Sequence, residues 1–336
     1  MNNIERKQNK RGIFRLAVPL LGLALAILFG MSCQKQKPIR IGYSDWPGWT
    51  AWQIAKEKGL FAKHGVDVEL VWFPIYTDSL TALSTGQIDA NSSAWSDVIP
   101  PLAEGIPLKV VLVNDNSHGN DGLVAKPEFK SIKDLRGKTI ATEIGTVDHF
   151  LMLQALAKNG MTEKDVEFKN LAVPDAAAAF IAGKVDAAVI WQPWLSNVQK
   201  SGKGKLLFSS ADIPGLIPDL LVFKEDVARN READVQKIVA TWFDVVEFIK
   251  TDEAQAIQIM AKVVEQKPED YKVFLPGTRF FNLEDNIKAF EPTEQDSSLK
   301  GSGKTITDFL SSAGLIKKQP DFSSALEPKF VKALKK

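Results

Sequence analysis

Tryptophans and carboxylates recur in the segments that we predict to connect strands to the helices that follow them. Five such segments, 44–49, 92–97, 118–121, 143–146 and 191–194, hold five of the chain's eight tryptophans and four carboxylates, and they hold no lysine or arginine. Carboxylates bind small cations through charge-assisted hydrogen bonds, and the faces of indole rings attract cations. The composition of these turns therefore favours a small amine or a planar guanidinium-like ligand.

The candidate ligand-binding residues are polar and aromatic side chains of these turns. They are Asp45, Trp46, Trp49, Ser93, Trp95, Asp97, Asn120, Asp121, Glu143, Thr146 and Trp191. Asp121 and Glu143 are the foremost candidates, with Trp46, Trp95 and Trp191 as walls. Each position also has a structural interpretation, because acidic residues cap helices and form turns, and tryptophans fill cores.

An anionic ligand is the opposing interpretation of the same turns. Helices that begin near Ser93, Thr146 and Pro193 would direct backbone amides at a negative group. Four nearby carboxylates would repel that group by several kcal/mol unless they were protonated or turned away. We therefore expect a cationic or zwitterionic ligand.

Alternating strands and helices position these turns. The expected strands are 39–43, 66–73, 88–91, 108–113, 139–142, 166–170 and 187–190. The expected helices between them are 49–60, 77–85, 94–104, 147–159, 175–182 and 193–200. This alternation predicts an α/β protein with a parallel, doubly wound sheet in each of two lobes. The chain from residue 229 onward has mostly helical periodicity, and we expect it to pack on the outside of the first lobe.

The expected organisation has four parts. They are a signal segment at 1–32, a tether at 33–38, lobe 1 formed by 39–126 plus 216–336, and lobe 2 formed by 127–215. Five basic residues precede the apolar run 16–31, which is shorter than the roughly 18 to 20 residues of a membrane-spanning helix. An export signal is therefore favoured over a retained membrane anchor.

Cys33 is the only cysteine, and it follows Gly30-Met31-Ser32. This stretch resembles the lipobox of bacterial lipoproteins, so we expect a lipid on Cys33, the alternative being an incidental cysteine. The chain beyond it can form no internal disulfide and no cysteine-based metal site. Residues 1–32 carry five basic side chains and one acidic, so their removal changes the net charge from +1 to −3. Such a balance, without a basic cluster, argues against a nucleic-acid-binding protein.

Several short phrases follow one another in a fixed order. They are 41–43 (IGY), 57–61 (EKGLF), 86–90 (GQIDA), 134–138 (DLRGK), 183–187 (GKVDA) and 191–194 (WQPW). In this order they resemble the type II periplasmic binding proteins, in the group of ABC importer receptors for nitrate, sulfonates, taurine and thiamine precursors. The resemblance runs from 39 to about 315. It implies a periplasmic or otherwise extracytoplasmic monomer that closes two lobes about a hinge, delivers a small molecule to an ABC permease and ATPase, and needs no cofactor.

Residues 117–123 (SHGNDGL) resemble the receptors associated with urea carboxylase and guanidine uptake. Guanidine is therefore the hypothesis for the ligand, and a receptor for taurine, alkanesulfonates or nitrate is the alternative. A thiamine-pyrimidine synthase-like enzyme is the alternative of another class, although the cysteine-rich motif of that enzyme is absent. The three histidines are dispersed, so no zinc site is expected.

Overall fold

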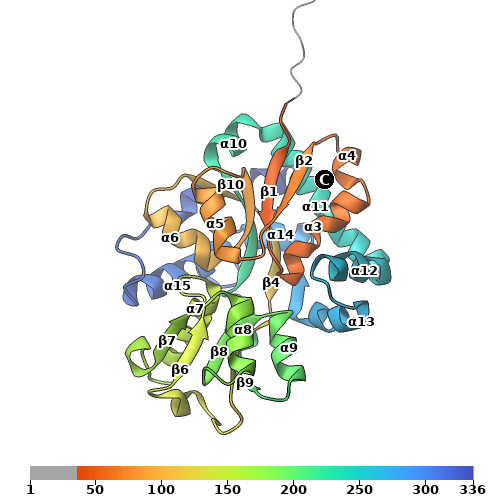
Figure 1. The fold of residues 1–336 in the computed structure, drawn as a ribbon. Helices are drawn as coiled ribbons and strands as arrows, with labels where there is room; N and C mark the ends of the chain where they lie inside the picture. Colours follow the sequence, from red (N-terminus) through yellow and green to blue (C-terminus); the bar gives the residue numbers. More distant parts are fainter. Residues whose placement is uncertain (1–35, 336) are drawn as a thin grey trace, which may run out of the picture. The chain divides into compact units, whose positions relative to one another are not determined.

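Two β-sheets, each covered by helices, make up the fold (Figure 1). The computed structural model describes residues 36–335, so the expected signal segment and Cys33 lie outside the described residues. The six-stranded sheet has the order β11-β4-β10-β3-β1-β2 and the five-stranded sheet the order β7-β6-β8-β5-β9. Both sheets belong to one compact unit that begins at Pro38. The predicted two-lobed α/β fold is confirmed, and we name the lobes after these sheets.

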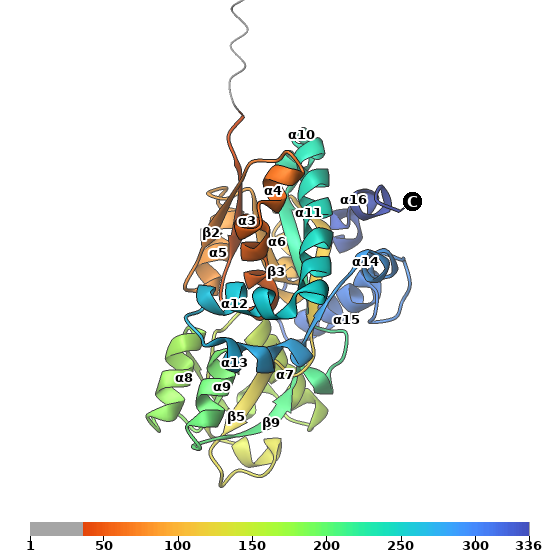
Figure 2. The ribbon, with the colours of Figure 1, turned by 90° about the vertical axis from the view of Figure 1, so that its right-hand side faces the viewer.

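The first lobe contains the six-stranded sheet. Its strands are β1 (Ile39–Tyr43), β2 (Val68–Trp72), β3 (Ala90–Ala94), β4 (Leu108–Ser117), β10 (Pro218–Lys224) and β11 (Thr278–Phe280). Its helices are α2 (Pro47–Thr50), α3 (Trp52–Glu57), α4 (Leu60–Lys63), α5 (Tyr76–Ser84), α6 (Trp95–Ala103), α10 (Glu225–Asn230), α11 (Glu232–Thr251), α12 (Glu253–Val263), α13 (Pro268–Tyr271), α14 (Leu283–Ala289), α15 (Leu299–Ser312) and α16 (Lys329–Lys332). The C-terminal helices pack on this lobe, with α11 against α3 and α15 against α6 (Figure 2).

The second lobe contains the five-stranded sheet. Its strands are β5 (Asp121–Ala125), β6 (Thr139–Thr142), β7 (Glu167–Asn170), β8 (Ala187–Trp191) and β9 (Lys205–Ser209). Its helices are α7 (Val147–Lys158), α8 (Val173–Ile181) and α9 (Trp194–Lys200). They pack on β5, β6 and β8. No helix among residues 36–335 combines the length and the apolar character that crossing a membrane requires.

The sheets are mixed, and not wholly parallel as expected. β1 pairs in parallel with β2 and β3, and β6 pairs in parallel with β7 and β8. In contrast, β10 and β11 are antiparallel to their neighbours in the first lobe, and β5 is antiparallel to β8 and β9. β5 is the first strand after the chain enters the second lobe, and β10 is the first strand after it returns to the first lobe. The sequence did not predict β9, β10 or β11.

The chain passes between the lobes twice. It leaves the first sheet after Ser117 and enters the second at Asp121, and it returns between Ser209 and Pro218. The expected first crossing near Lys126 is therefore too late, because β5 pairs with β8 and β9 in the second lobe. The apolar sequence of β5 is compatible with either sheet, so hydrophobic periodicity could not assign this strand to one lobe. The expected return near Leu216 falls within the observed connection.

The two crossings touch each other. The hydroxyl groups of Ser117 and Ser210 are 2.8 Å apart, and the backbone amide of Gly119 donates to the Ser210 hydroxyl at 2.6 Å. Gly119 has φ 108°, a conformation that a residue with a side chain rarely adopts. These contacts join the two connections side by side into one hinge.

Two further differences concern the boundaries of predicted elements. The expected helix 49–60 is divided into α2, α3 and α4, and Gly59 precedes α4 with φ 65°. The expected strand 108–113 continues as β4 to Ser117 and so carries Asp115 into the sheet. β4 and β10 are almost wholly buried, which explains their long apolar runs, and Asp115 and Asp219 are their buried charged residues.

Candidate functional site

Side chains from the two lobes bond to each other where the strand-to-helix turns meet. Asp45, after β1, accepts hydrogen bonds from the indole nitrogens of Trp191 at 2.8 Å and Trp194 at 2.5 Å, which lie at the end of β8 and the start of α9 in the other lobe. Glu143, after β6, accepts hydrogen bonds from the hydroxyl of Thr77 at 2.6 Å and from its backbone amide at 3.3 Å. These bonds hold the lobes in a closed arrangement.

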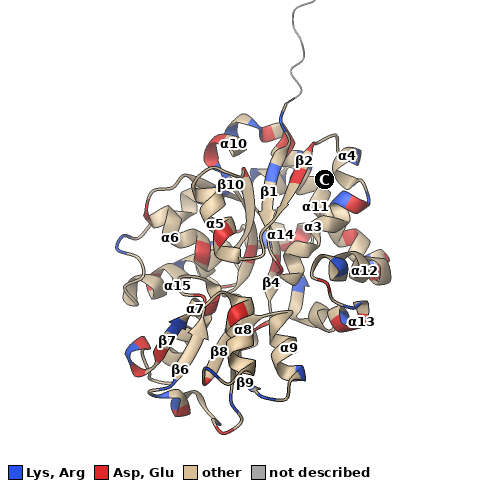
Figure 3. Ribbon diagram, in the orientation of Figure 1, with Lys and Arg blue, Asp and Glu red and all other residues tan. Residues whose placement is uncertain are grey.

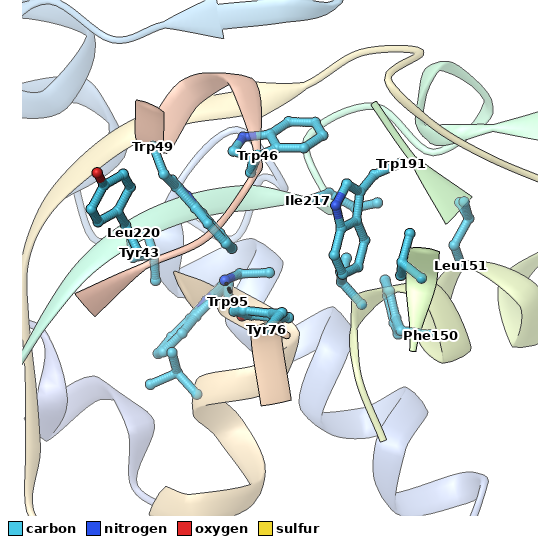
Figure 4. Packing of buried hydrophobic residues seen from close by; sticks show 14 of the residues in the cluster. Tyr43, Trp46, Trp49, Tyr76, Trp95, Phe150, Leu151, Trp191, Ile217 and Leu220 are labelled. Atoms are coloured by element: carbon cyan, nitrogen blue, oxygen red, sulfur yellow. Dashed lines mark hydrogen bonds between the residues drawn. The ribbon is translucent and has the colours of Figure 1, made fainter. Parts of the chain in front are cut away.

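A small cavity lies between the closed lobes. Its walls come from both sheets and are formed by Trp46, Trp49, Asp121, Val147, Trp191, Ile217 and Asp219. Its free volume is ≈ 10 Å³, about the space that one water molecule needs. Figure 4 shows Trp46, Trp49, Trp191 and Tyr76 arranged around this space. Tyr76 packs against Trp49 and Trp191 with ring centroids 5.0 and 5.8 Å apart, so aromatic rings from both lobes contact one another here.

Seven carboxyl groups from both lobes are buried at this boundary. They are Asp45, Asp97, Asp115, Asp121, Glu143, Asp148 and Asp219, and none is more than 7% exposed. Figure 3 marks the Asp and Glu positions on the ribbon in red, and several of them lie where the two lobes meet. Within residues 36–335, none of the seven forms an ion pair with a lysine, arginine or histidine. The cluster therefore has a strong excess of acidic groups.

Burial is the main cause of altered proton affinity in this cluster. It raises the pKa of Asp45 to about 6, although hydrogen bonds from Trp191 and Trp194 lower it. It raises the pKa of Asp121 to about 7, against the opposing hydrogen bond from the Ser117 hydroxyl. Because a carboxylate loses the favourable solvation of water on burial, each of these groups binds a proton more readily than in solution.

Burial also raises the pKa values of Asp97 and Glu143. Burial raises the pKa of Asp97 to about 7, although hydrogen bonds from Tyr76 and Ser96 lower it. Burial also raises the pKa of Glu143, which the hydroxyl and amide of Thr77 lower. Both carboxyl groups therefore titrate above their usual range.

Asp148 is the acid of the cluster whose carboxyl group lacks hydrogen-bond partners altogether among the described residues. It lies in the first turn of α7, its side chain is fully buried, and neither carboxyl oxygen has a hydrogen-bond partner. Burial raises its pKa well above the usual value, and the charges of Asp121, Glu143, Asp97 and Asp45 raise it further. A cation entering this boundary would relieve both effects.

Asp115 and Asp219 form a carboxyl pair beside the cavity. They are direct partners across the antiparallel strands β4 and β10. The indole nitrogen of Trp46 donates to Oδ1 of Asp115 at 2.9 Å, whereas Oδ2 of each aspartate has no donor. Burial raises the pKa of both groups, and each carboxyl affects the titration of the other.

The structure brings most of the predicted residues to this boundary, in three different roles. Asp121 and the tryptophans Trp46, Trp49 and Trp191 line the cavity itself. Asp45 and Glu143 bond across the lobes beside it. Asp97 lies at the start of α6, where its Oδ2 has no hydrogen-bond partner.

Four predicted residues have structural contacts. The indole of Trp95 donates to the carbonyl of Leu299 at 3.1 Å in the core of the first lobe, away from the cavity. Ser93 is fully buried in β3 and accepts from Asn91 at 3.0 Å. The amide of Asn120 donates at the hinge to the carbonyl of Phe274 and the hydroxyl of Thr278. The hydroxyl of Thr146 donates to the carbonyl of Glu143 at 2.7 Å and shapes the turn before α7.

Three acids of the cluster were missed by reasoning from the turns, and so were the contacts of Tyr76 and Thr77. Asp115, Asp148 and Asp219 lie within a strand or a helix. A signal for two of them was present, since Asp115 and Asp219 lie at the ends of long apolar runs, where an unpaired buried charge needs a reason. Among residues 36–335, no group of His, Cys, Asp or Glu side chains has the arrangement of a metal site.

Comparisons with known proteins identify the family. A protein of Brucella abortus that carries the name of a binding protein is 29% identical over 92% of this chain and 94% of its own length. An Escherichia coli protein named for binding aliphatic sulfonates is 28% identical over 76% of this chain and 80% of its own length. The solved structure of the periplasmic aliphatic sulphonate binding protein SsuA from Escherichia coli has a TM-score of 0.71 and 24% identity, and covers 87% of this chain and 92% of that one. The family model "NMT1/THI5 like" matches residues 46–256, and the chain therefore belongs to the NMT1/THI5-like family.

Proposed function

We propose that this protein is an extracytoplasmic solute-binding receptor of an ABC importer, and that it captures a small nitrogenous cation or zwitterion, such as guanidinium, between its lobes. Relatives of nearly equal length that carry the names of binding proteins, together with the two-lobed hinged fold, support the receptor role. The expected partners are an ABC permease and its ATPase, and the expected anchor is a lipid on Cys33. No catalytic step forms part of this proposal.

The observation that carries the proposal is the buried acidic cluster without a basic partner. Seven carboxyl groups converge on the interlobe boundary, and two of them, Asp121 and Asp219, line the cavity. Burying an uncompensated negative charge is strongly unfavourable, so such a cluster requires protons, cations or both. An anion placed here would add to the repulsion, whereas a cation would reduce it.

The aromatic walls favour the same class of ligand. Trp46, Trp49 and Trp191 line the cavity and direct ring faces or edges toward it (Figure 4). A cation held against an indole face gains about 0.5 to 2 kcal/mol, with the larger value where water is excluded. The small free volume favours a ligand of only a few heavy atoms. Because the cavity is enclosed by both lobes, the lobes must separate before a ligand can enter. Guanidinium is planar, small and rich in hydrogen-bond donors, but it is larger than one water molecule, so its binding also requires the cavity walls to move apart.

A receptor for taurine or an alkanesulfonate is the second candidate. Relatives named for binding sulfonates favour it, and α7 begins at this boundary without a side-chain cap, so its N-terminus can attract an anion. Taurine also carries an ammonium group that the carboxylates could bind. A simple alkanesulfonate lacks that group and would meet the acidic cluster without a counter-charge.

Isothermal titration calorimetry of the purified protein tests the proposal. Guanidinium chloride, taurine and ethanesulfonate are titrated separately, with urea as the neutral analogue of guanidinium and sodium chloride as the control for ionic strength. We expect saturable binding of guanidinium and none of urea or ethanesulfonate. Tight binding of taurine or ethanesulfonate, with none of guanidinium, would overturn the cation assignment and favour the second candidate.

Two variants test the site. Asp121→Asn and Glu143→Gln are each expected to weaken binding more than tenfold, which is about 1.4 kcal/mol or more. Asp121 acts in the cavity wall, and Glu143 acts through its bond to Thr77 across the lobes. Asp226→Asn is the matched control, because Asp226 is exposed on α10 at the outside of the first lobe. Unchanged affinity in both site variants would refute the assignment of these residues.

A further inference from the structure

We propose that the Asp115–Asp219 carboxyl pair holds one shared proton in the unliganded receptor and that the bound cation replaces this proton. The inference rests on the proposed binding of a cation, and it adds a residue pair and a chemical exchange to that function. It identifies the pair as the element that distinguishes a charged ligand from a neutral one of the same shape.

The position of the pair is the first argument. Asp219 lines the cavity, and Asp115 is its direct cross-strand partner. Asp115 is fully buried and Asp219 is 2% exposed. A Cβ atom on Gly48 would come within 1.8 Å of Oδ2 of Asp115, so the backbone of α2 lies directly on this carboxyl group. Water therefore has little access to the pair.

The pattern of hydrogen bonds is the second argument. Trp46 supplies a donor to Oδ1 of Asp115, but neither Oδ2 atom of the pair has a donor from any other side chain or backbone amide. Two ionised carboxylates in contact repel each other, and a single proton between them turns that repulsion into a hydrogen bond. One shared proton would therefore stabilise the pair.

The groups around the pair make its full ionisation still less favourable. The facing titratable groups include Asp121 on β5, whose charge raises the pKa of both members of the pair, and Asp97 on α6, whose charge raises that of Asp219. Tyr76 on α5 also faces Asp219, and its hydroxyl accepts a hydrogen bond from the amide of Ala94. Tyr271 on α13 also faces the pair, but its hydroxyl bonds to Thr50 and to the carbonyl of Pro47.

No basic group offsets these acids. On β11, Phe280 is the partner of Asp115, and the neighbouring Arg279 extends to Asp285 at the surface. The neighbour on β3 is Ala94, the partner of Asp219, and the neighbour just before α2 is Trp46, whose indole donates to Asp115. Within residues 36–335, every charged group that faces the pair is therefore acidic.

The exchange is balanced in charge. A protonated pair and a cation in solution become an ionised pair in contact with the cation, and one proton passes to water. A neutral analogue such as urea brings no charge, so the proton stays and the pair offers it fewer acceptors. Cation affinity should therefore increase with pH by about tenfold per pH unit while one proton is displaced.

Calorimetry in several buffers counts the protons. Guanidinium chloride is titrated at pH 5.5, 6.5 and 7.5, in buffers that differ in their enthalpy of ionisation, because the observed heat varies with the number of protons released. We expect a net release that includes about one proton from the pair at the lower pH. Saturable binding without any proton release at these pH values would overturn this inference and leave the proposed function standing, whereas no binding at any pH would overturn both.

A pair of variants assigns the proton. Asp219→Asn leaves a single carboxyl that can bond to the new amide, so the release should fall by about one proton and the pH dependence should weaken. Asp226→Asn should keep the full release. An unchanged release in Asp219→Asn would show that other acids supply the protons and would overturn the assignment.

A spectroscopic measurement on the unchanged protein provides a second test if the variant fails to fold. Difference infrared spectra record the carbonyl stretch of protonated carboxylic acids before and after addition of guanidinium. Loss of that band at pH 6 supports the exchange. A carboxylic-acid band that does not change on saturation with guanidinium would overturn it.

Discussion

Replacing Asp121 with asparagine should stabilise the unliganded protein, and the gain should increase with pH. Asp121 is 2% exposed, and its one side-chain partner is the Ser117 hydroxyl. Burial raises its pKa from 3.8 to about 7. A group whose pKa is raised on folding contributes stability that is present below the unfolded value and is lost as pH increases through the folded value. For Asp121 that range is pH 3.8 to about 7.

The magnitude follows from the shift. Each pKa unit corresponds to 1.36 kcal/mol, so a shift of about three units makes folding less favourable by about 4 kcal/mol at pH 8. At pH 5 the same argument gives about 2 kcal/mol, because only part of the range has been crossed. Asparagine keeps an acceptor for Ser117 and carries no charge. Any penalty for its buried amide is the same at both pH values, so the difference of about 2 kcal/mol isolates the charge.

Urea denaturation at pH 5 and pH 8, without added cation, measures this difference. We expect the free energy of unfolding of Asp121→Asn, relative to that of the parent protein, to be about 2 kcal/mol larger at pH 8 than at pH 5. Asp226→Asn should show no such dependence. An equal effect of Asp121→Asn at the two pH values would refute the claim that burial raises the pKa of Asp121 and makes its ionisation destabilising.

Three further changes test other parts of the site. Gly48→Ala would place a Cβ atom 1.8 Å from Oδ2 of Asp115, so thermal unfolding should show a loss of about 1 to 3 kcal/mol and calorimetry a weaker affinity; an unchanged melting curve would contradict the close approach. Thr77→Val removes the 2.6 Å hydroxyl bond to Glu143 between the lobes, so small-angle X-ray scattering should give a larger radius of gyration, and an unchanged radius would show that the bond does not hold closure. Trp191→Ala removes a cavity wall, so guanidinium affinity should fall at least tenfold while far-ultraviolet circular dichroism stays the same; unchanged affinity would remove Trp191 from the site.

The fold was predictable where the order of elements decides it. The parallel strands around β1 and β6 follow from the alternation of apolar runs and amphipathic helices, and so do the turns that carry Asp45 and Glu143. The membership of β5 in the second sheet was not predictable, because its pairing with β8 and β9 joins segments far apart in the sequence. The fully buried strand β10 shows no alternation that would separate it from other apolar segments.

The site was predictable only in part, for a related reason. Turn composition indicated an acidic and indole-rich boundary, but it could not show which rings face the cavity. Trp95 follows β3 just as Trp46 follows β1, yet Trp95 turns into the core to bond the carbonyl of Leu299 on α15. Asp115 and Asp219 meet only because β4 and β10 are neighbours in the sheet, a pairing that spacing along the chain does not contain.

The hinge contact between Ser117 and Ser210 has a mechanical consequence. Asp121 begins the strand that follows Ser117, so it belongs to the second lobe, whereas Asp115 belongs to the first, only two residues before the hinge serine. Rotation about this point would draw like charges apart, and closure would crowd them together. In the proposed receptor, closure would therefore be opposed by repulsion among these acids, and either a bound cation or protonation of the acids would favour the closed arrangement.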